Sequence, residues 1–287
     1  MDGILLFDKP IGETSRSSAN KLARLFNEKK VGYVGTLDPF ASGLLIMAFG
    51  KSTKAVTFFK DSIKEYEATL KLGEATSTLD NESEVIETKS VKELNEEQIS
   101  KVLLSFLGES EQIPPLTSAI HVNGKRLYEY AHKGIEVDRP TRKINVFDIK
   151  LLDYNKNDST IRFYCKVSKG TYIRSLGSDI ANKLDTVGHL IQLRRISVDC
   201  FKVDEAYSLT DLANNNYKIY STYEILSRFI EVVTLKDSDI EDIKNGKRTY
   251  LDFSTNKNTI LVSDSNKTAI AIYQKENNKF RFVRGLF

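Results

Sequence analysis

The sequence is poor in the residues that build metal sites and disulfide frameworks. Its 287 residues include two cysteines, three histidines and no tryptophan. Cys165 and Cys200 are too few for a disulfide framework and stand in no CxxC or Cys/His spacing, and the histidines form no HxxxH or HxxE pair. We therefore expect a chain that works in the reducing cytoplasm and binds no metal ion.

Long apolar runs are also missing. No segment approaches the roughly 18 apolar residues of a membrane span, and the apolar stretch at the N-terminus is too short for the core of a signal peptide. We therefore expect no membrane association. A hydrophobic share of 40% with 28% charged residues is typical of a folded globular protein. The length allows one large domain or a main domain with a smaller companion.

The charge is unevenly distributed along the chain. The net charge is only +3, but residues 61–113 carry 5 Lys against 13 Asp or Glu, a net −8. The rest of the chain therefore sums to +11, and residues 113–143 alone carry 6 Lys or Arg against 3 acids. Such an excess suits a surface that binds a polyanion such as RNA, although a scatter of solvated cations explains the charge equally well.

Hydrophobic periodicity predicts a mixture of helices and strands. Helical spacing follows Ser15, which we expect to cap the first helix, and also follows a capping-box pattern at Asn95 and Gln98. A third helix should open at about residue 173. The predicted strands are residues 44–49, 65–72, 144–153 and 160–168, with three shorter strands at 259–262, 269–273 and 280–283.

Asp38 lies in a glycine-rich stretch, residues 31–43, that we expect to be an ordered loop. The pentapeptide Gly-Thr-Leu-Asp-Pro at residues 35–39 is weak evidence by itself, because an Asx turn that caps local backbone explains an Asp-Pro pair well. A functional interpretation therefore needs other residues.

Three other residues could form a catalytic site together with Asp38. Tyr66 heads the inward face of an alternating strand, and Tyr172 and Arg174 stand at a helix entrance. A carboxylate can attack a sugar C1′, an arginine can keep that carboxylate ionised, and an aromatic ring can stack on a displaced base. Each residue also has a structural alternative: Tyr66 as a core aromatic, Arg174 as a surface residue, and Tyr172 as a packing contact against the preceding strand.

Six sequence motifs follow one another along most of the chain. In chain order they are Gly-Ile-Leu-Leu-Phe-Asp-Lys-Pro at 3–10, the glycine-rich motif at 34–45, Lys-Glu-Tyr at 64–66, the segment from Pro114 through Ser118, Ala119 and Gly124 to Tyr128, Gly-Thr-Tyr-Ile-Arg at 170–174, and Leu-Arg-Arg at 193–195. In these motifs and their order the chain resembles the TruB-type tRNA pseudouridine synthases, in which the motif at 34–45 corresponds to the catalytic loop.

The resemblance implies an α+β pseudouridine-synthase fold with a mixed, mainly antiparallel sheet and flanking helices. The catalytic domain would span residues 1–225, with an RNA-gripping insertion at about 111–148. A small PUA-like β domain would follow at 230–287. The substrate would be uridine 55 in the T stem-loop of tRNA, flipped out of the loop and isomerised by a monomer that needs neither a cofactor nor a guide RNA.

The resemblance also assigns roles to residues. Asp38 would be the nucleophile, with Arg174 paired to it. Tyr66 would stack on the uracil, and Tyr172 and Leu193 would line the base pocket. A binding protein that folds tRNA without turnover is the alternative, but it would not need these residues together.

Two parts of the chain depart from the family pattern. In the first, His121 stands where family members commonly carry a lysine, and Leu116 and Thr117 replace the usual aromatic before Ser118. The second lies in the stretch before Asp38. Family members usually carry a histidine where this chain has Tyr33. A tyrosine can stack and donate one hydrogen bond, but it cannot carry positive charge. We therefore expect Tyr33 to contact the RNA in a different way.

Overall fold

The computed structural model describes residues 1–59, 62–118, 120–131, 133–135 and 137–287. By contact density the chain forms two compact units. One combines residues 1–38, 44–60 and 200–287, and the other combines residues 39–43 and 61–199. The expected domain boundary near residue 230 stays a prediction.

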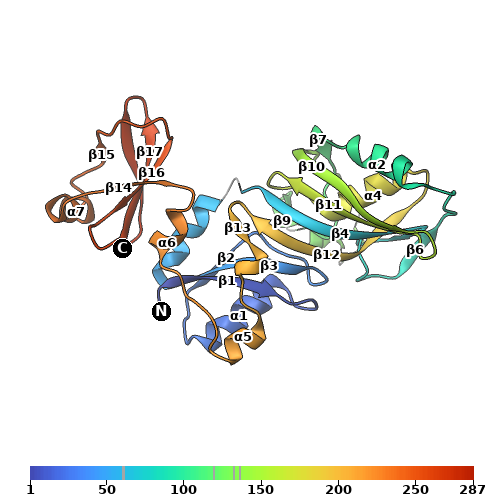
Figure 1. Cartoon of the computed structure of the whole chain (residues 1–287), viewed down its shortest axis with the longest axis horizontal. Coiled ribbons are helices and arrows are strands. Elements are labelled where there is room, and N and C mark those ends of the chain that lie inside the picture. Colours follow the sequence, from blue (N-terminus) through green and yellow to red (C-terminus); the bar gives the residue numbers. More distant parts are fainter. Residues whose placement is uncertain (60–61, 119, 132, 136) are drawn as a thin grey trace. The chain divides into compact units, whose positions relative to one another are not determined.

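The second unit is built on an antiparallel run of five strands. In spatial order these are β12 (Gly188–Val198), β4 (Lys64–Leu72), β11 (Thr160–Val167), β10 (Arg142–Asn155) and β7 (Gly108–Gln112). Figure 1 shows the long strands β4, β11 and β10 side by side. The start of β3 (Ser42–Phe49) pairs with β12 in parallel, which makes the sheet mixed. The expected α+β fold with a mixed, mainly antiparallel sheet is confirmed.

Strand β4 has the alternating pattern that its sequence predicts. Tyr66, Ala68, Leu70 and Leu72 are buried, and the residues between them are half-buried. Because side chains alternate between the two faces of a strand, these four residues share one face. Two helices cover that face: α4 (Ile173–Lys183) contacts β12 and β4, while α2 (Glu96–Leu104) contacts β10 and α4. The expected capping box is present, because Asn95 and Gln98 bond reciprocally at the start of α2.

The first unit begins with β1 (Gly3–Lys9) and α1 (Ser15–Leu25). Ser15 is the first helical residue and not the cap, because the side chain that accepts the capping hydrogen bond belongs to Thr14. The expected loop at 31–43 is also shorter than predicted. Its first four residues form β2 (Val31–Val34), which pairs antiparallel with β3. Three of its four residues, Val31, Tyr33 and Val34, favour strands, and their β propensity outweighs the turn signal of Gly32 and Gly35.

The C-terminal segment of the first unit forms a five-stranded sheet with its own core. The strand order is β14 (Glu231–Thr234), β16 (Thr259–Ser263), β17 (Ala269–Glu276), β18 (Lys279–Gly285) and β15 (Tyr250–Leu251). Helix α7 (Asp237–Lys244) contributes Ile240 and Ile243 to the core. The three short strands expected here are confirmed, while the likeness to a PUA domain stays a prediction.

Short elements complete both units. In chain order these are η1 (Gly50–Phe59), β5 (Glu74–Thr76), β6 (Val85–Thr88), β8 (His121–Val122), β9 (Lys125–Arg126), α3 (Leu127–Ala131), β13 (Phe201–Lys202), η2 (Val203–Glu205), α5 (Leu209–Ala213) and α6 (Thr222–Leu226). In the described part of the basic segment at 113–143, the regular elements are a small hairpin, one helical turn and the first two residues of β10. Ala119 of this segment lies outside the described residues. No helix in the described part of the chain is long and apolar enough to cross a membrane.

Candidate active site

The loop that carries Asp38 is anchored on its N-terminal side by the first turn of α1. The Ser15 hydroxyl accepts a hydrogen bond from the Leu37 backbone N–H at 2.8 Å and donates one to the Leu37 carbonyl at 3.0 Å. Ser15 and Leu37 are both buried, whereas Asp38 is half-buried. The residue immediately before Asp38 is therefore fixed, while Asp38 itself is not fully enclosed.

Replacing Ser15 with alanine should lower the stability of this loop. The substitution removes the hydroxyl and leaves the buried Leu37 amide and carbonyl without those two bonds, at a cost of about 1–3 kcal/mol in the free energy of unfolding. Urea denaturation measures the change. Ser17→Ala is the matched control, because the Ser17 hydroxyl bonds to the Thr14 carbonyl on the exposed side of the same turn. Equal losses for both variants would contradict the anchoring role.

The C-terminal side of the same loop approaches β12 at a glycine. Gly43 has a φ of +106°, and a Cβ placed on it would lie 2.3 Å from the Arg195 carbonyl oxygen. Only glycine combines that backbone conformation with that close approach. The register pairs Ser42 with Arg194 and Gly43 with Arg195, so the loop ends at a defined point on β12.

Tyr66 lies opposite a fully buried arginine. Antiparallel register pairs Tyr66 of β4 with Arg195 of β12, and a side-chain hydrogen bond joins the guanidinium to the Tyr66 hydroxyl. Burial lowers the pKa of Arg195 from its ordinary value, while the contact with Tyr66 opposes that shift. The Tyr66 ring is 7% exposed, so the phenol is both oriented and largely shielded from water.

A second cation lies at the start of the same strand. Burial, with a smaller contribution from the charge of Arg195, lowers the pKa of Lys64 to about 8. Its Nζ donates to the Ser62 hydroxyl at 2.8 Å. Lys64 and Tyr66 are two residues apart in β4 and therefore lie on the same face of the strand.

Lys64 should make the stability of the protein depend on pH. Its pKa is lower in the folded state than the ordinary lysine value of 10.5, so the unfolded chain holds the proton more tightly. Between about pH 8 and pH 10.5 the unfolded state binds more protons, and this contribution to stability rises with pH. Urea denaturation across this range should show the free energy of unfolding of the wild type rising with pH relative to that of Lys64→Met. A difference that stays constant with pH would contradict the shifted pKa.

Leu193 lies on the same face of the sheet as Tyr66. It pairs with Ala68, two residues along β4 from Tyr66. Helix α4 covers this face closely, since a Cβ on Gly177 would lie 2.8 Å from Leu190. The structure thus brings Tyr66 and Leu193 to the same sheet face, beneath α4. The N-terminus of that helix carries two further expected site residues, Tyr172 and Arg174.

Tyr172 caps the N-terminus of α4 with its backbone held by a glutamine. The Gln112 side chain accepts a hydrogen bond from the Tyr172 N–H at 2.8 Å and donates one to the Tyr172 carbonyl at 3.1 Å. Gln112 ends β7 and is buried. This two-point contact fixes the helix entrance relative to the sheet.

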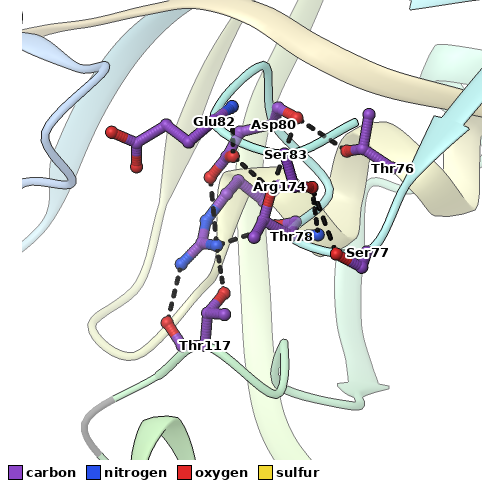
Figure 2. Close-up of polar contacts among 8 residues, drawn as sticks. All are labelled: Thr76, Ser77, Thr78, Asp80, Glu82, Ser83, Thr117 and Arg174. Atoms are coloured by element: carbon purple, nitrogen blue, oxygen red, sulfur yellow. Dashed lines mark hydrogen bonds and ion pairs between the residues drawn. The ribbon is translucent and has the colours of Figure 1, made fainter. Parts of the chain in front are cut away.

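Arg174 forms a buried ion pair that the sequence analysis did not predict. Its guanidinium lies 3.2 Å from the Asp80 carboxylate, and the two side chains are 4% and 1% exposed. Figure 2 shows the arginine reaching between the turn of Asp80 and Thr117. Arg174 also donates to the Thr78 carbonyl at 2.8 Å, to the Thr117 hydroxyl at 2.7 Å and to the Thr117 carbonyl at 3.2 Å.

Asp80 is itself held by its own turn. Its carboxylate accepts hydrogen bonds from the Thr78 hydroxyl at 2.5 Å and from the Glu82 N–H at 3.0 Å (Figure 2). The Asp80 carbonyl accepts a further bond from Thr76 at 2.6 Å. Asp80 therefore presents a fixed negative charge to Arg174. The expected pairing of Arg174 with Asp38 stays a prediction.

Tyr33 lies in β2 and is half-buried. The guanidinium carbon of Arg16, in the first turn of α1, lies 6.0 Å from the centroid of the Tyr33 ring.

No cluster of three or more His, Cys, Asp or Glu that could hold a metal ion occurs among the residues that the structure describes.

Two family models match consecutive parts of the chain. Residues 23–173 match the TruB family pseudouridylate synthase N-terminal domain, and residues 174–233 match the tRNA pseudouridylate synthase B C-terminal domain.

Curated relatives extend this likeness to nearly the whole chain. The tRNA pseudouridine synthase B of Mesoplasma florum is 36% identical over 99% of this chain and 97% of its own length. Those of Bacillus velezensis and Dechloromonas aromatica are 44% and 45% identical, each over 74% of this chain and 70% of the relative. A solved structure, a crystal structure of a Cbf5-Nop10-Gar1 complex, covers 99% of this chain and 85% of its own with a TM-score of 0.75. At 22% identity that likeness shows the fold alone.

Proposed function

Because the chain belongs to the TruB family of pseudouridylate synthases, we propose that it converts uridine 55 in the T loop of tRNA to pseudouridine. The family makes the chain an isomerase that forms pseudouridine in tRNA. The observation that carries the proposal is the likeness to tRNA pseudouridine synthases across 99% of the chain. That likeness includes the anchored loop that presents Asp38.

The proposed reaction conserves atoms and electrons. The bond between C1′ and N1 of the uridine breaks, the detached uracil rotates, and a bond forms between C1′ and C5. The proton on C5 is lost and N1 gains one. No oxidant, reductant or group donor enters the balance, so the proposed mechanism uses no cofactor.

In this mechanism Asp38 attacks C1′ or stabilises the positive charge that develops there. The uridine must first leave the loop, since a stacked nucleotide does not expose its sugar to a carboxylate. The anchoring of Leu37 by Ser15 supports this role, because an aspartate that follows a fixed residue loses less freedom when it reacts.

The remaining residues would form the base pocket. Tyr66 would stack on the uracil, with Leu193 from the same sheet face and Tyr172 from the start of α4 lining the pocket. The shared face of Tyr66 and Leu193, and the position of α4 over that face, support this arrangement. Tyr33 would contact the RNA from β2.

Arg174 would hold the Asp38 carboxylate in its ionised form. A buried guanidinium can do this only if its own orientation is fixed, and the Asp80 carboxylate and Thr117 hydroxyl provide that fixation. Asp80 thus becomes a supporting residue for the nucleophile, one step removed from the RNA.

We further propose that the enzyme works as a monomer in the cytoplasm, without a guide RNA, and recognises the T arm by shape. Single-stranded loops with unstacked bases are what proteins read most readily in structured RNA. The chain's net +11 outside residues 61–113 suits a phosphate backbone.

One experiment tests the target and the independence from a guide together. The purified chain is incubated alone with an unmodified tRNA transcript and with an isolated T stem-loop, and pseudouridine is mapped by chemical modification and primer extension. We expect modification at position 55 in both RNAs. Modification elsewhere would contradict the target, and binding without modification would show a tRNA-folding protein in place of an enzyme.

A further inference from the structure

The outer side of the first turn of α1 carries a stacked arginine. The Arg16 guanidinium lies over the Tyr33 ring, 6.0 Å from its centroid. Arg16 is exposed and Tyr33 is half-buried. A guanidinium over an aromatic ring is attracted by the electrons of the ring face, while its N–H groups can still donate hydrogen bonds.

The positive charge of Arg16 is not neutralised by the acid closest to it in sequence. Glu13 forms an ion pair with Lys21 and accepts a hydrogen bond from Ser18 at 3.0 Å. Arg16 takes part in none of the ion pairs found in the described part of the chain. An oriented cation without a carboxylate partner is suited to an anion from outside the protein.

This cation is rigidly connected to the loop of Asp38. Ser15, the neighbour of Arg16, holds Leu37 through two hydrogen bonds of 2.8 and 3.0 Å. Tyr33 pairs in register with Met47 and lies in the strand that leads into the same loop. An anion bound by Arg16 would therefore lie at a fixed position relative to Asp38.

We propose that Arg16, stacked on Tyr33, binds a backbone phosphate of the substrate RNA close to the target nucleotide. The planar fork of a guanidinium matches two phosphate oxygens, so the contact fixes the register of the RNA as well as adding affinity. The proposal rests on the proposed function, since it takes RNA to be the substrate. It assigns to Arg16 the task of placing the uridine sugar over Asp38.

The test compares Arg16→Gln with Arg24→Gln, a matched control in the last turn of the same helix, where the arginine is also exposed. Binding of an unmodified tRNA transcript is measured by filter retention over a series of KCl concentrations. Removing one phosphate contact should weaken binding about 5- to 10-fold and lower the slope of log K against log salt by about 0.7–0.9. Tyr33→Ala should weaken binding in the same direction, because the arginine loses its ring.

Two results would overturn the proposal: Arg16→Gln with the affinity and salt slope of the wild type, or an equal loss in Arg24→Gln. The first result would show that Arg16 binds no phosphate of the RNA. The second would show that binding responds to the net charge of the protein and not to the position of Arg16. Circular dichroism melting confirms that each variant is folded. Binding is scored without turnover, so a wild type that binds the transcript but makes no pseudouridine refutes the proposed function and still decides the role of Arg16.

Discussion

Asp38→Asn should form no pseudouridine above background in an unmodified tRNA transcript. The amide keeps the size and planar shape of the carboxylate, but it carries no charge and can neither attack C1′ nor stabilise a positive charge there. We expect a loss on the order of 10⁴-fold or more in single-turnover rate, as for the loss of other catalytic groups that act directly on substrate. RNA affinity and melting temperature should stay close to those of the wild type.

The control for this variant is Asp153→Asn. Asp153 is an exposed aspartate on β10, outside the proposed active site. Its change to asparagine removes the same charge as Asp38→Asn does. It should retain full activity. A wild-type rate for Asp38→Asn would refute the assignment of the nucleophile, and an unfolded Asp38→Asn would make Asp38 a structural residue of its loop.

Asp80→Asn should be the most destabilising of the conservative changes near the candidate site. The variant removes the carboxylate charge from an ion pair whose members are 4% and 1% exposed. Breaking a buried pair from one side costs about 3–5 kcal/mol, because the remaining charge stays buried without its counter-charge. We also expect the rate of pseudouridine formation to fall by about 100-fold, since Arg174 would lose its charged partner and shift from its present position. Urea denaturation and single-turnover assays measure the two effects.

The Lys92–Asp185 pair provides the matched comparison for Asp80. Its side chains are 69% and 71% exposed at a distance of 2.9 Å. Asp185→Asn removes the same kind of contact from a solvated pair and should lower the free energy of unfolding far less than Asp80→Asn does, because solvent screens an exposed pair. Equal effects of Asp80→Asn and Asp185→Asn on the free energy of unfolding would show that the buried pair has no special weight.

Local pattern was sufficient for the regular elements around the site. The alternation in β4 predicted which face carries Tyr66, and the capping box predicted the start of α2. Both signals depend on residues close together in sequence. The order of the motifs supplied the family resemblance, and the resemblance predicted the fold. Neither follows from hydrophobic periodicity.

The contacts that hold the site could not be predicted in this way. Ser15 contacts a residue 22 positions later, and Asp80 contacts one 94 positions later, so no local pattern marks either. The serine was expected to cap a helix, because its hydroxyl suits that role as well as it suits the loop. Asp80 is one of 13 acidic residues between 61 and 113, so nothing in the sequence distinguishes it from its acidic neighbours. Tyr33 falls in a predicted loop because glycines stand beside it in the sequence, at 32 and 35, and glycine is typical of turns.

Release of tritium tests the central claim most directly. A tRNA transcript labelled at C5 of its uridines loses one tritium to water for each pseudouridine formed, so the measurement follows the reaction itself. With the purified chain alone, we expect release to approach one equivalent per transcript and to disappear when position 55 is changed from uridine to cytidine. No release from the unchanged transcript, or equal release from the cytidine variant, would contradict the proposed function.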